Sequence, residues 1–423
     1  MVATVMRQIK RILILILVIF TAFIGQDAPP KVERWRAVSQ PYQFNFLQWE
    51  VENLPNKWRY SISTLGGDND LPRDEELEEV RNYFTREEEL AGFQRQIELS
   101  RDRAGNDSAA QKGDAEEKAG RLRAEQDKAR NLVEYILEEQ TSAVLKEQGL
   151  VVSLPLFGTE LVFPPVDFEF SRLPKVLIIS PRNRIELTDT VTLTPEIDHE
   201  TREDIEDKSE SFGVSALVEN IGGIATYPSM VPSNLSLRAS LDTIAHEWLH
   251  AYLFFYPLGR RYFDNYRMTQ INETVVDIGS REIGCLIYQI YDGAAEDCSA
   301  DYLENEAPKG VTGFNFNREM RETRLTVDRL LEVGQIEEAE EFMEQKRRYL
   351  QDNGYYIRKL NQAYFAFHGT YADQPTSVSP IGQQLRELRK RSRSLDDFIK
   401  TVSRISSYQE YEELVKGLDG SSY

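Results

Sequence analysis

The segment LDTIAHEWLHAYLFF, residues 241–255, constrains the fold more than any other stretch of this chain. At about 100° per residue on a helix, one apolar stripe contains Leu241, Ile244, Trp248, Tyr252 and Phe255. His246 and His250 then lie together on roughly the opposite side, because residues four apart are neighbours on a helix. We therefore expect a helix that buries its stripe in the core and points both imidazoles at one place.

Two imidazoles at this spacing can share a metal ion. Glu247 lies next to His246, about 100° further round the helix, where a general base could reach water activated by that metal. The same letters also fit an apolar core helix with two incidental histidines. The HExxH pattern alone does not decide between these interpretations.

The downstream segment QINETVVDIGSREIG offers a third ligand. A catalytic zinc ion takes three protein ligands and keeps one open position. Glu273 follows His250 by 23 residues and can complete such a set. Asp277 follows one helical turn later and can accept the outer N–H of a ligating imidazole. Pro257 and Gly259 are predicted to end the first helix and let the chain return.

HExxH followed by NExxxD resembles the gluzincin metallopeptidases. The resemblance implies that His246, His250 and Glu273 bind zinc, that Glu247 is the general base and that Asp277 supports a ligand. The layout of residues 213–415 is also similar to a group of bacterial predicted aminopeptidases. The chain departs from that group in the residues that surround the two metal motifs.

Two further segments carry candidate substrate contacts. SALVENIGGIATYP resembles the edge strand of aminopeptidase N-like enzymes, which implies that Glu219 holds a free amine and that Gly222 and Gly223 allow close backbone approach. An ordinary strand that ends in a turn fits equally well. In KLNQAYFAFHGTYADQP, Tyr371 and His368, together with the nearby Tyr364, are candidate donors for the oxyanion of peptide hydrolysis. A structural role for the histidine is the alternative.

Composition narrows the function classes. The net charge of −20 argues against a nucleic-acid partner. Arg7, Lys10 and Arg11 precede an apolar run over residues 12–24, the layout of a signal peptide or signal anchor. The run is shorter than the roughly 20 residues of a comfortable span. We expect a single-pass anchor in the cell membrane, with the rest of the chain outside the cytoplasm.

The compartment and the state of the cysteines are less constrained. Asn272 begins an NET sequon inside the expected metal helix, where a sugar would not fit, and this favours a bacterial envelope. Cys285 and Cys298 can pair outside the cytoplasm, and they can equally be free buried thiols.

The expected organisation is α+β and mostly helical. Residues 1–30 form the signal segment, 31–72 a juxtamembrane segment, 73–149 a helical hairpin with its tip at 104–114, and 150–423 a zincin-like domain with a small β-sheet. The aromatic stretch 42–58 suits either a membrane interface or a helix docked on the main domain. His199, in an acidic helical stretch, is expected at the surface.

Two functional hypotheses follow. The first is a membrane-anchored zinc metallopeptidase that hydrolyses peptides or proteins through a zinc-activated water, in a narrower form an aminopeptidase. The alternative is a non-enzymatic envelope protein with a structural or inactive zinc site, whose helical hairpin binds a partner.

Overall fold

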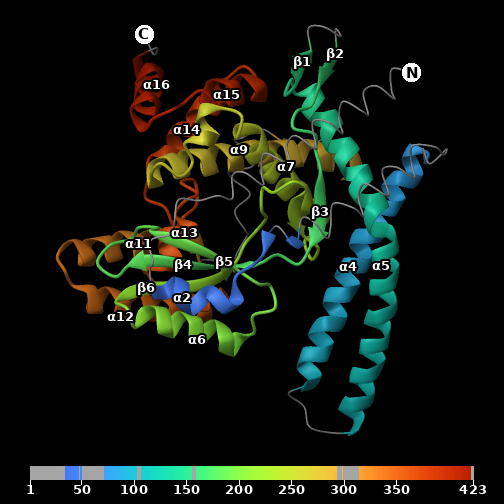
Figure 1. Ribbon diagram of the computed structural model, residues 1–423, viewed down its shortest axis with the longest axis horizontal. Coiled ribbons are helices and arrows are strands. Elements are labelled where there is room, and N and C mark those ends of the chain that lie inside the picture. Colours follow the sequence, from blue (N-terminus) through green and yellow to red (C-terminus); the bar gives the residue numbers. More distant parts are fainter. Residues whose placement is uncertain are drawn as a thin grey trace.

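The computed structural model describes residues 34–46, 48–49, 71–101, 106–154, 159–292, 298 and 314–420. These residues form a mostly helical α+β architecture with three small sheets (Figure 1). The expected signal segment, residues 1–30, and most of the juxtamembrane segment, 31–72, lie outside them. Within the part that is described, no helix has the length and apolar character needed to cross a bilayer.

Two long helices, α4 (Arg73–Arg101) and α5 (Asn106–Glu147), pack side by side as an extended arm of the molecule (Figure 1). Apolar residues at helical spacing, such as Val80 and Val133, are buried between them and the main body. We predicted the turn at 104–114, but α5 already begins at Asn106. A single glycine within a helix, here Gly113, costs only about 1 kcal/mol, so it does not end the helix.

We predicted one small sheet, and the strands form three. β1 (Val152–Leu154) pairs antiparallel with β2 (Thr159–Leu161), and β3 (Phe168–Ser171) pairs parallel with β7 (Ser229–Pro232). The third sheet has the order β5-β4-β6, formed by Asp189–Leu193, Lys175–Pro181 and Val214–Asn220. Proline has no N–H for a sheet ladder, so Pro164 and Pro165, between β2 and β3, interrupt strand pairing.

Helices cover both faces of this three-stranded sheet (Figure 1). On one face lie α2 (Arg34–Ser39) and α6 (His199–Glu210), whose first turn is capped by Asp198. On the other face lies α13 (Gln362–His368). The short 3-10 helix η1 (Gln40–Tyr42) follows α2, and the backbone at 42–44 bonds to the outer edge of β5. His199 is exposed, as predicted.

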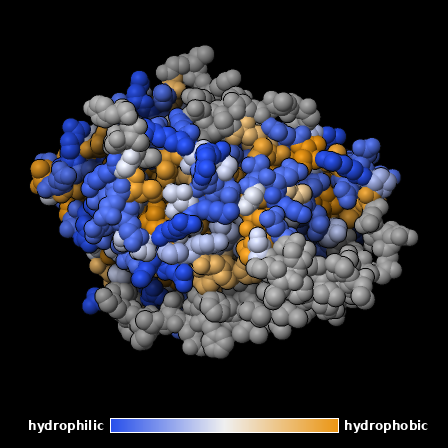
Figure 2. Space-filling view, turned by 90° about the horizontal axis from the view of Figure 1, so that it is seen from above, coloured by the Kyte–Doolittle hydropathy of each residue, from blue (hydrophilic) through white to orange (hydrophobic). Residues whose placement is uncertain are grey.

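The largest core surrounds α7 (Leu237–Leu253) and α9 (Tyr266–Asp292), which pack closely along one another. Helices that continue this lobe are α8 (Pro257–Arg260), α14 (Ile381–Arg391), α15 (Leu395–Val402) and α16 (Tyr408–Gly420). A separate apolar cluster joins α11 (Phe316–Glu332) to α12 (Ile336–Asp352). Hydrophilic residues cover much of the face in Figure 2, with smaller apolar areas between them.

The helix that carries the histidines ends earlier than predicted. It stops at Leu253, so Phe255 lies beyond the buried stripe and is 37% exposed. The cause is Pro257, because a residue before proline is pushed out of the helical region. That residue, Tyr256, is extended, and Pro257 begins α8 instead of merely ending α7. A Cβ at Gly259 would lie 2.2 Å from the Leu253 carbonyl oxygen, so glycine permits the tight return of the chain.

Candidate metal centre

The two histidines of α7 share the side that faces α9. Ser236 begins α7 by accepting a hydrogen bond from the backbone N–H of Ala239. The apolar residues Leu241, Ile244 and Trp248 are buried in the main core, as the periodicity predicted. The imidazole rings of His246 and His250 then lie with their centroids 4.8 Å apart. The core-facing stripe therefore fixes where both rings point.

Glu273 of α9 completes a set of three donor atoms. Its Oε2 lies 3.4 Å from Nε2 of His250 and 3.7 Å from Nε2 of His246, and the two Nε2 atoms are 3.2 Å apart. A tetrahedral zinc ion with bonds of 2.0–2.1 Å separates its ligand atoms by about 3.3 Å. The three residues singled out in the sequence thus form a triangle of the size that a zinc ion requires.

The hydrogen bonds of Glu273 support this interpretation. The hydroxyl group of Tyr262 donates to Oε1 of Glu273. The other oxygen, Oε2, is buried and has no hydrogen-bond partner. A buried carboxylate oxygen without a partner is unfavourable unless another group neutralises it. Oε2 is the atom that faces both imidazoles, so a cation at the centre of the triangle would satisfy it.

The electrostatics keep the ligand carboxylate ionised. Burial alone would raise the pKa of Glu273, but His250 and His246 lower the pKa well below its usual range. Burial raises the pKa of the adjacent Glu247, and the two histidines offset this only in part. The two glutamates therefore differ in role: one is held as an anion towards the imidazoles, and the other is poised closer to proton exchange.

Glu247 is in contact with the chain that leaves β6. A Cβ at Gly223 would lie 2.1 Å from Oε1 of Glu247, so any other residue here would displace the Glu247 side chain. At Gly222 no atom lies within 4 Å of such a Cβ, so this position has no steric need for glycine. Of the two glycines, Gly223 therefore contacts the candidate site and Gly222 does not.

The two candidate oxyanion donors occupy different surroundings. The ring of Tyr371 lies 6.1 Å from the ring of His246. Burial, and then the nearby Glu273, raises the pKa of Tyr371 well above its usual range, so its hydroxyl stays a proton donor. His368 instead packs on Tyr364, with ring centroids 4.2 Å apart, and burial lowers the pKa of His368 to about 4. The structure brings Tyr371 to the site, while the ring contacts of His368 are with its neighbours on α13 and not with the donor triangle.

Asp277 does not occupy the place that the resemblance implied. Its Oδ2 lies 2.5 Å from an Nη of Arg281 on the same helix, and its carboxyl group also contacts Asp373. Across the described residues, no hydrogen bond or ion pair joins Asp277 to His246 or His250. An arginine one turn further along α9 pairs with this carboxylate, and a supporting role of Asp277 for a ligand histidine stays a prediction.

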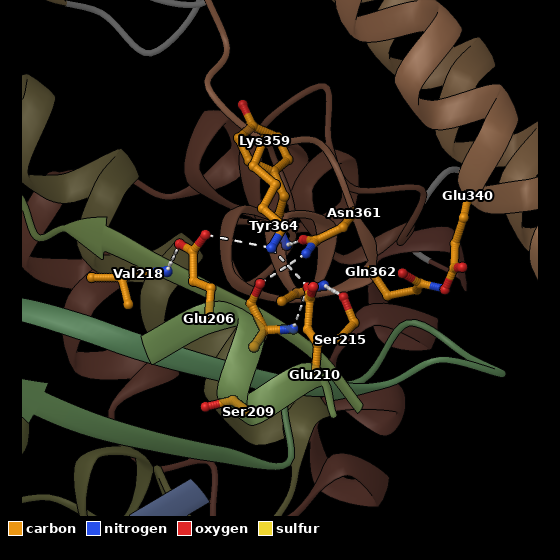
Figure 3. A network of polar contacts seen from close by, with 12 residues as sticks. Glu206, Ser209, Glu210, Ser215, Val218, Glu340, Lys359, Asn361, Gln362 and Tyr364 are labelled. Atoms are coloured by element: carbon orange, nitrogen blue, oxygen red, sulfur yellow. Dashed lines mark hydrogen bonds and ion pairs between the residues drawn. The ribbon is translucent and has the colours of Figure 1, made fainter. Parts of the chain in front are cut away.

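The outer edge of β6 is closed by side chains of the same chain (Figure 3). The backbone N–H of Val218 donates to Glu206, and the carbonyl oxygen of Val218 accepts from Arg358. The carbonyl oxygen of Ala216 accepts from Asn361. We expected this strand to pair with a substrate backbone, and these bonds occupy that edge up to Val218. Beyond Val218, Glu219 pairs with Val176 of β4, and burial raises the pKa of its carboxyl group.

Sequence reasoning missed Tyr262, Arg281 and Asp373. Tyr262 lies in the return between α8 and α9, and no spacing rule links it to Glu273. Its one signal was an aromatic residue in the loop that joins two ligand helices. Searches against protein-family models, curated proteins and solved structures find no match to this chain.

Proposed function

We propose that this protein is a zinc-dependent peptidase of the gluzincin type. The observation that carries the proposal is the buried triangle of two Nε2 atoms and Oε2 of Glu273, in which Oε2 lacks any other partner. Two imidazoles and one carboxylate suit zinc and leave a fourth position open. A bound zinc ion would supply Lewis-acid chemistry, by acidifying water and polarising a carbonyl group.

The chain's own residues supply the proton transfers. Glu247 is buried directly beside both ligand histidines, and Gly223 holds the backbone against it. We assign Glu247 the role of general base, which accepts the proton of the attacking water and passes it to the leaving amine. Tyr371 keeps its proton and donates a hydrogen bond to the developing oxyanion. Tyr262 orients Glu273 through its hydroxyl group.

The closed edge of β6 favours an exopeptidase. An extended peptide gains affinity by pairing with a free strand edge. Here the edge is occupied as far as Val218, and the chain reaches Glu247 only five residues later, at Gly223. The short segment between them leaves room for few substrate residues on that side. The resemblance of this segment to the edge strand of aminopeptidase N-like enzymes points the same way, so we propose aminopeptidase activity. Glu219, which faces Arg202 and Arg358, is the candidate contact for the free amino terminus.

The location of the protein is part of the same proposal. Cys285 and Cys298 form a disulfide. Disulfides persist mainly in oxidising compartments, which supports a catalytic domain outside the cytoplasm. The basic and apolar N-terminal segment would attach it to the membrane as a single-pass anchor.

The test combines metal content with peptide cleavage, using the full chain in detergent. We expect a stoichiometric amount of zinc and cleavage of peptides from a broad library, with free amino termini preferred over acetylated ones. Glu247→Gln should keep its zinc and lower kcat by about 10²–10⁴-fold. The matched control is Glu282→Gln, which alters another buried carboxylate, paired with Arg389 on α14.

Two outcomes would count against this proposal. A wild-type chain that holds zinc and cleaves no peptide in the library would exclude a peptidase. Equal cleavage of free and acetylated peptides would exclude the aminopeptidase assignment and leave the metal centre standing.

A further inference from the structure

One face of α9 carries a row of polar side chains beside the ligand Glu273. Gln270, Thr274 and Asp277 are spaced four and three residues apart, so they lie along one face of the helix. All three contact the segment that follows α13, residues 369–373. Gln270 and Thr274 are buried, and Asp277 is half-buried. A buried polar group is costly unless it is hydrogen-bonded, so the partner of each side chain matters.

The first two contacts fix the backbone on either side of Tyr371. Nε2 of Gln270 donates to the carbonyl oxygen of Gly369 at 2.8 Å, and the N–H of Ala372 donates to Oγ1 of Thr274 at 2.9 Å. Both bonds are buried. Tyr371 therefore lies between two points at which the segment is bonded to the helix that carries Glu273.

The third contact is between two carboxyl groups. The side chain of Asp373 is only 4% exposed and is hydrogen-bonded to Asp277. Burial, and then the charge of Asp277, raises the pKa of Asp373 well above its usual range. The protonated form of Asp373, which can donate to Asp277, is therefore favoured. Arg281 faces both carboxyl groups, at 2.5 Å from Asp277 and 3.8 Å from Asp373. Arg386 also faces this pair electrostatically.

The position of this pair relates it to the metal centre. Asp277 is one helical turn from Glu273, and Asp373 is two residues from Tyr371. The contact between Asp277 and Asp373 therefore fixes the position of the loop that carries Tyr371 relative to the helix that carries Glu273.

We propose that Asp373 is a positioning residue, which holds Tyr371 over the His246–His250–Glu273 group by hydrogen bonding to Asp277. This inference rests on the peptidase function proposed above. A displacement of about 1 Å at a catalytic group can lower the rate by 10²-fold, so Asp373→Ala should lower kcat by about 10–100-fold and change KM less.

A double-mutant cycle distinguishes positioning from a general structural role. If Asp373 acts through Tyr371, the double variant with Tyr371→Phe and Asp373→Ala has the same kcat as Tyr371→Phe alone. Additive losses would overturn the inference. Asp373→Asn keeps a donor for Asp277 and should restore most of kcat. Thr274→Val, which removes the acceptor of Ala372, provides a second route if Asp373→Ala does not fold.

Hydrogen–deuterium exchange gives a readout that is independent of catalysis. Asp373→Ala should accelerate amide exchange over residues 369–373 while zinc content stays unchanged. Glu282→Gln, the matched control on α9, should leave that exchange as in the wild type. Unchanged exchange in Asp373→Ala would overturn the positioning role even if the wild type is an active peptidase. If the wild type cleaves nothing, the proposed function fails, and exchange alone decides the role of Asp373.

Discussion

The helix pairs α4–α5 and α7–α9 both pack through a buried apolar seam, but their buried carboxylates have different surroundings. Both bury an apolar seam, with Leu137 in the first and Leu249 in the second fully buried. They differ in their buried carboxylates. Glu134 of α5 accepts the backbone N–H of Phe170, so its charge supports the architecture. Oε2 of Glu273 on α9 accepts no hydrogen bond.

The difference shows which buried charges indicate function. A carboxylate that is satisfied by backbone groups stabilises the element it touches. A carboxylate that is buried beside two imidazoles, with one oxygen that accepts no hydrogen bond, is instead available to bind a cation. The pair α7–α9 therefore has the properties of a site, while α4–α5 has those of a scaffold with solvated outer faces.

The largest expected effect comes from removing the unpartnered carboxylate. Glu273→Ala should lower zinc affinity by more than about 100-fold, beyond the loss expected for an outer contact. Glu134→Ala, its counterpart in the hairpin, should leave zinc binding intact and destabilise the fold by about 1–3 kcal/mol, because a backbone N–H loses its acceptor. Metal content after dialysis and urea unfolding measure the two effects. Full zinc retention in Glu273→Ala would show that Glu273 is no more a metal ligand than Glu134.

The apolar seams should respond alike. Leu249 packs against Gly279 of α9, where a Cβ would come within 2.9 Å of its Cδ1. Leu249→Ala should lower the free energy of unfolding by about 2–5 kcal/mol, and Leu137→Ala in the hairpin by a similar amount. Urea denaturation measures both. If only one variant were destabilised, the two seams would not be equivalent.

A smaller loss is expected at the outer contact of the ligand. Tyr262→Phe removes the hydroxyl that donates to Glu273 and should weaken zinc binding by about 10–100-fold. Competition with a chelator gives the affinity. Tyr356→Phe is the matched control, because Tyr356 is 74% exposed. Equal affinities in both variants would mean that Tyr262 does not orient the ligand.

The smallest effect is expected on the outer face of the hairpin. Arg121 pairs with Glu117 one turn away, and their side chains are 75% and 65% exposed. Arg121→Ala should change the free energy of unfolding by less than about 0.5 kcal/mol. Thermal unfolding at two salt concentrations measures this. A larger loss of unfolding free energy would show that the Arg121–Glu117 pair stabilises the hairpin.

Local sequence patterns were sufficient to select the three candidate ligands. Helix geometry links His246 to His250, the downstream NExxxD segment supplied Glu273, and the structure brings the three donor atoms together. The mostly helical α+β class also follows from local patterns. What these predictions share is that each depends on residues within one helix or on two helices joined by a short return.

The rest depends on contacts between distant segments. The bonds from Gln270 and Thr274 to residues 369–372 cross about a hundred positions of sequence, and no local pattern encodes them. The division of the strands into three sheets likewise reflects pairing of β3 with the distant β7. The early end of α7 is different, because the restriction that Pro257 places on Tyr256 was readable in the sequence.

The covered edges of the three-stranded sheet have a consequence for solubility. An open strand edge is a template for pairing with another chain, and so for aggregation. Here residues 42–44 bond to the edge of β5, and Glu206, Arg358 and Asn361 bond to the edge of β6. A strand from another chain therefore cannot pair with the occupied parts of either edge. The side chains that occupy the edge of β6 therefore also hinder edge-to-edge pairing between copies of this protein.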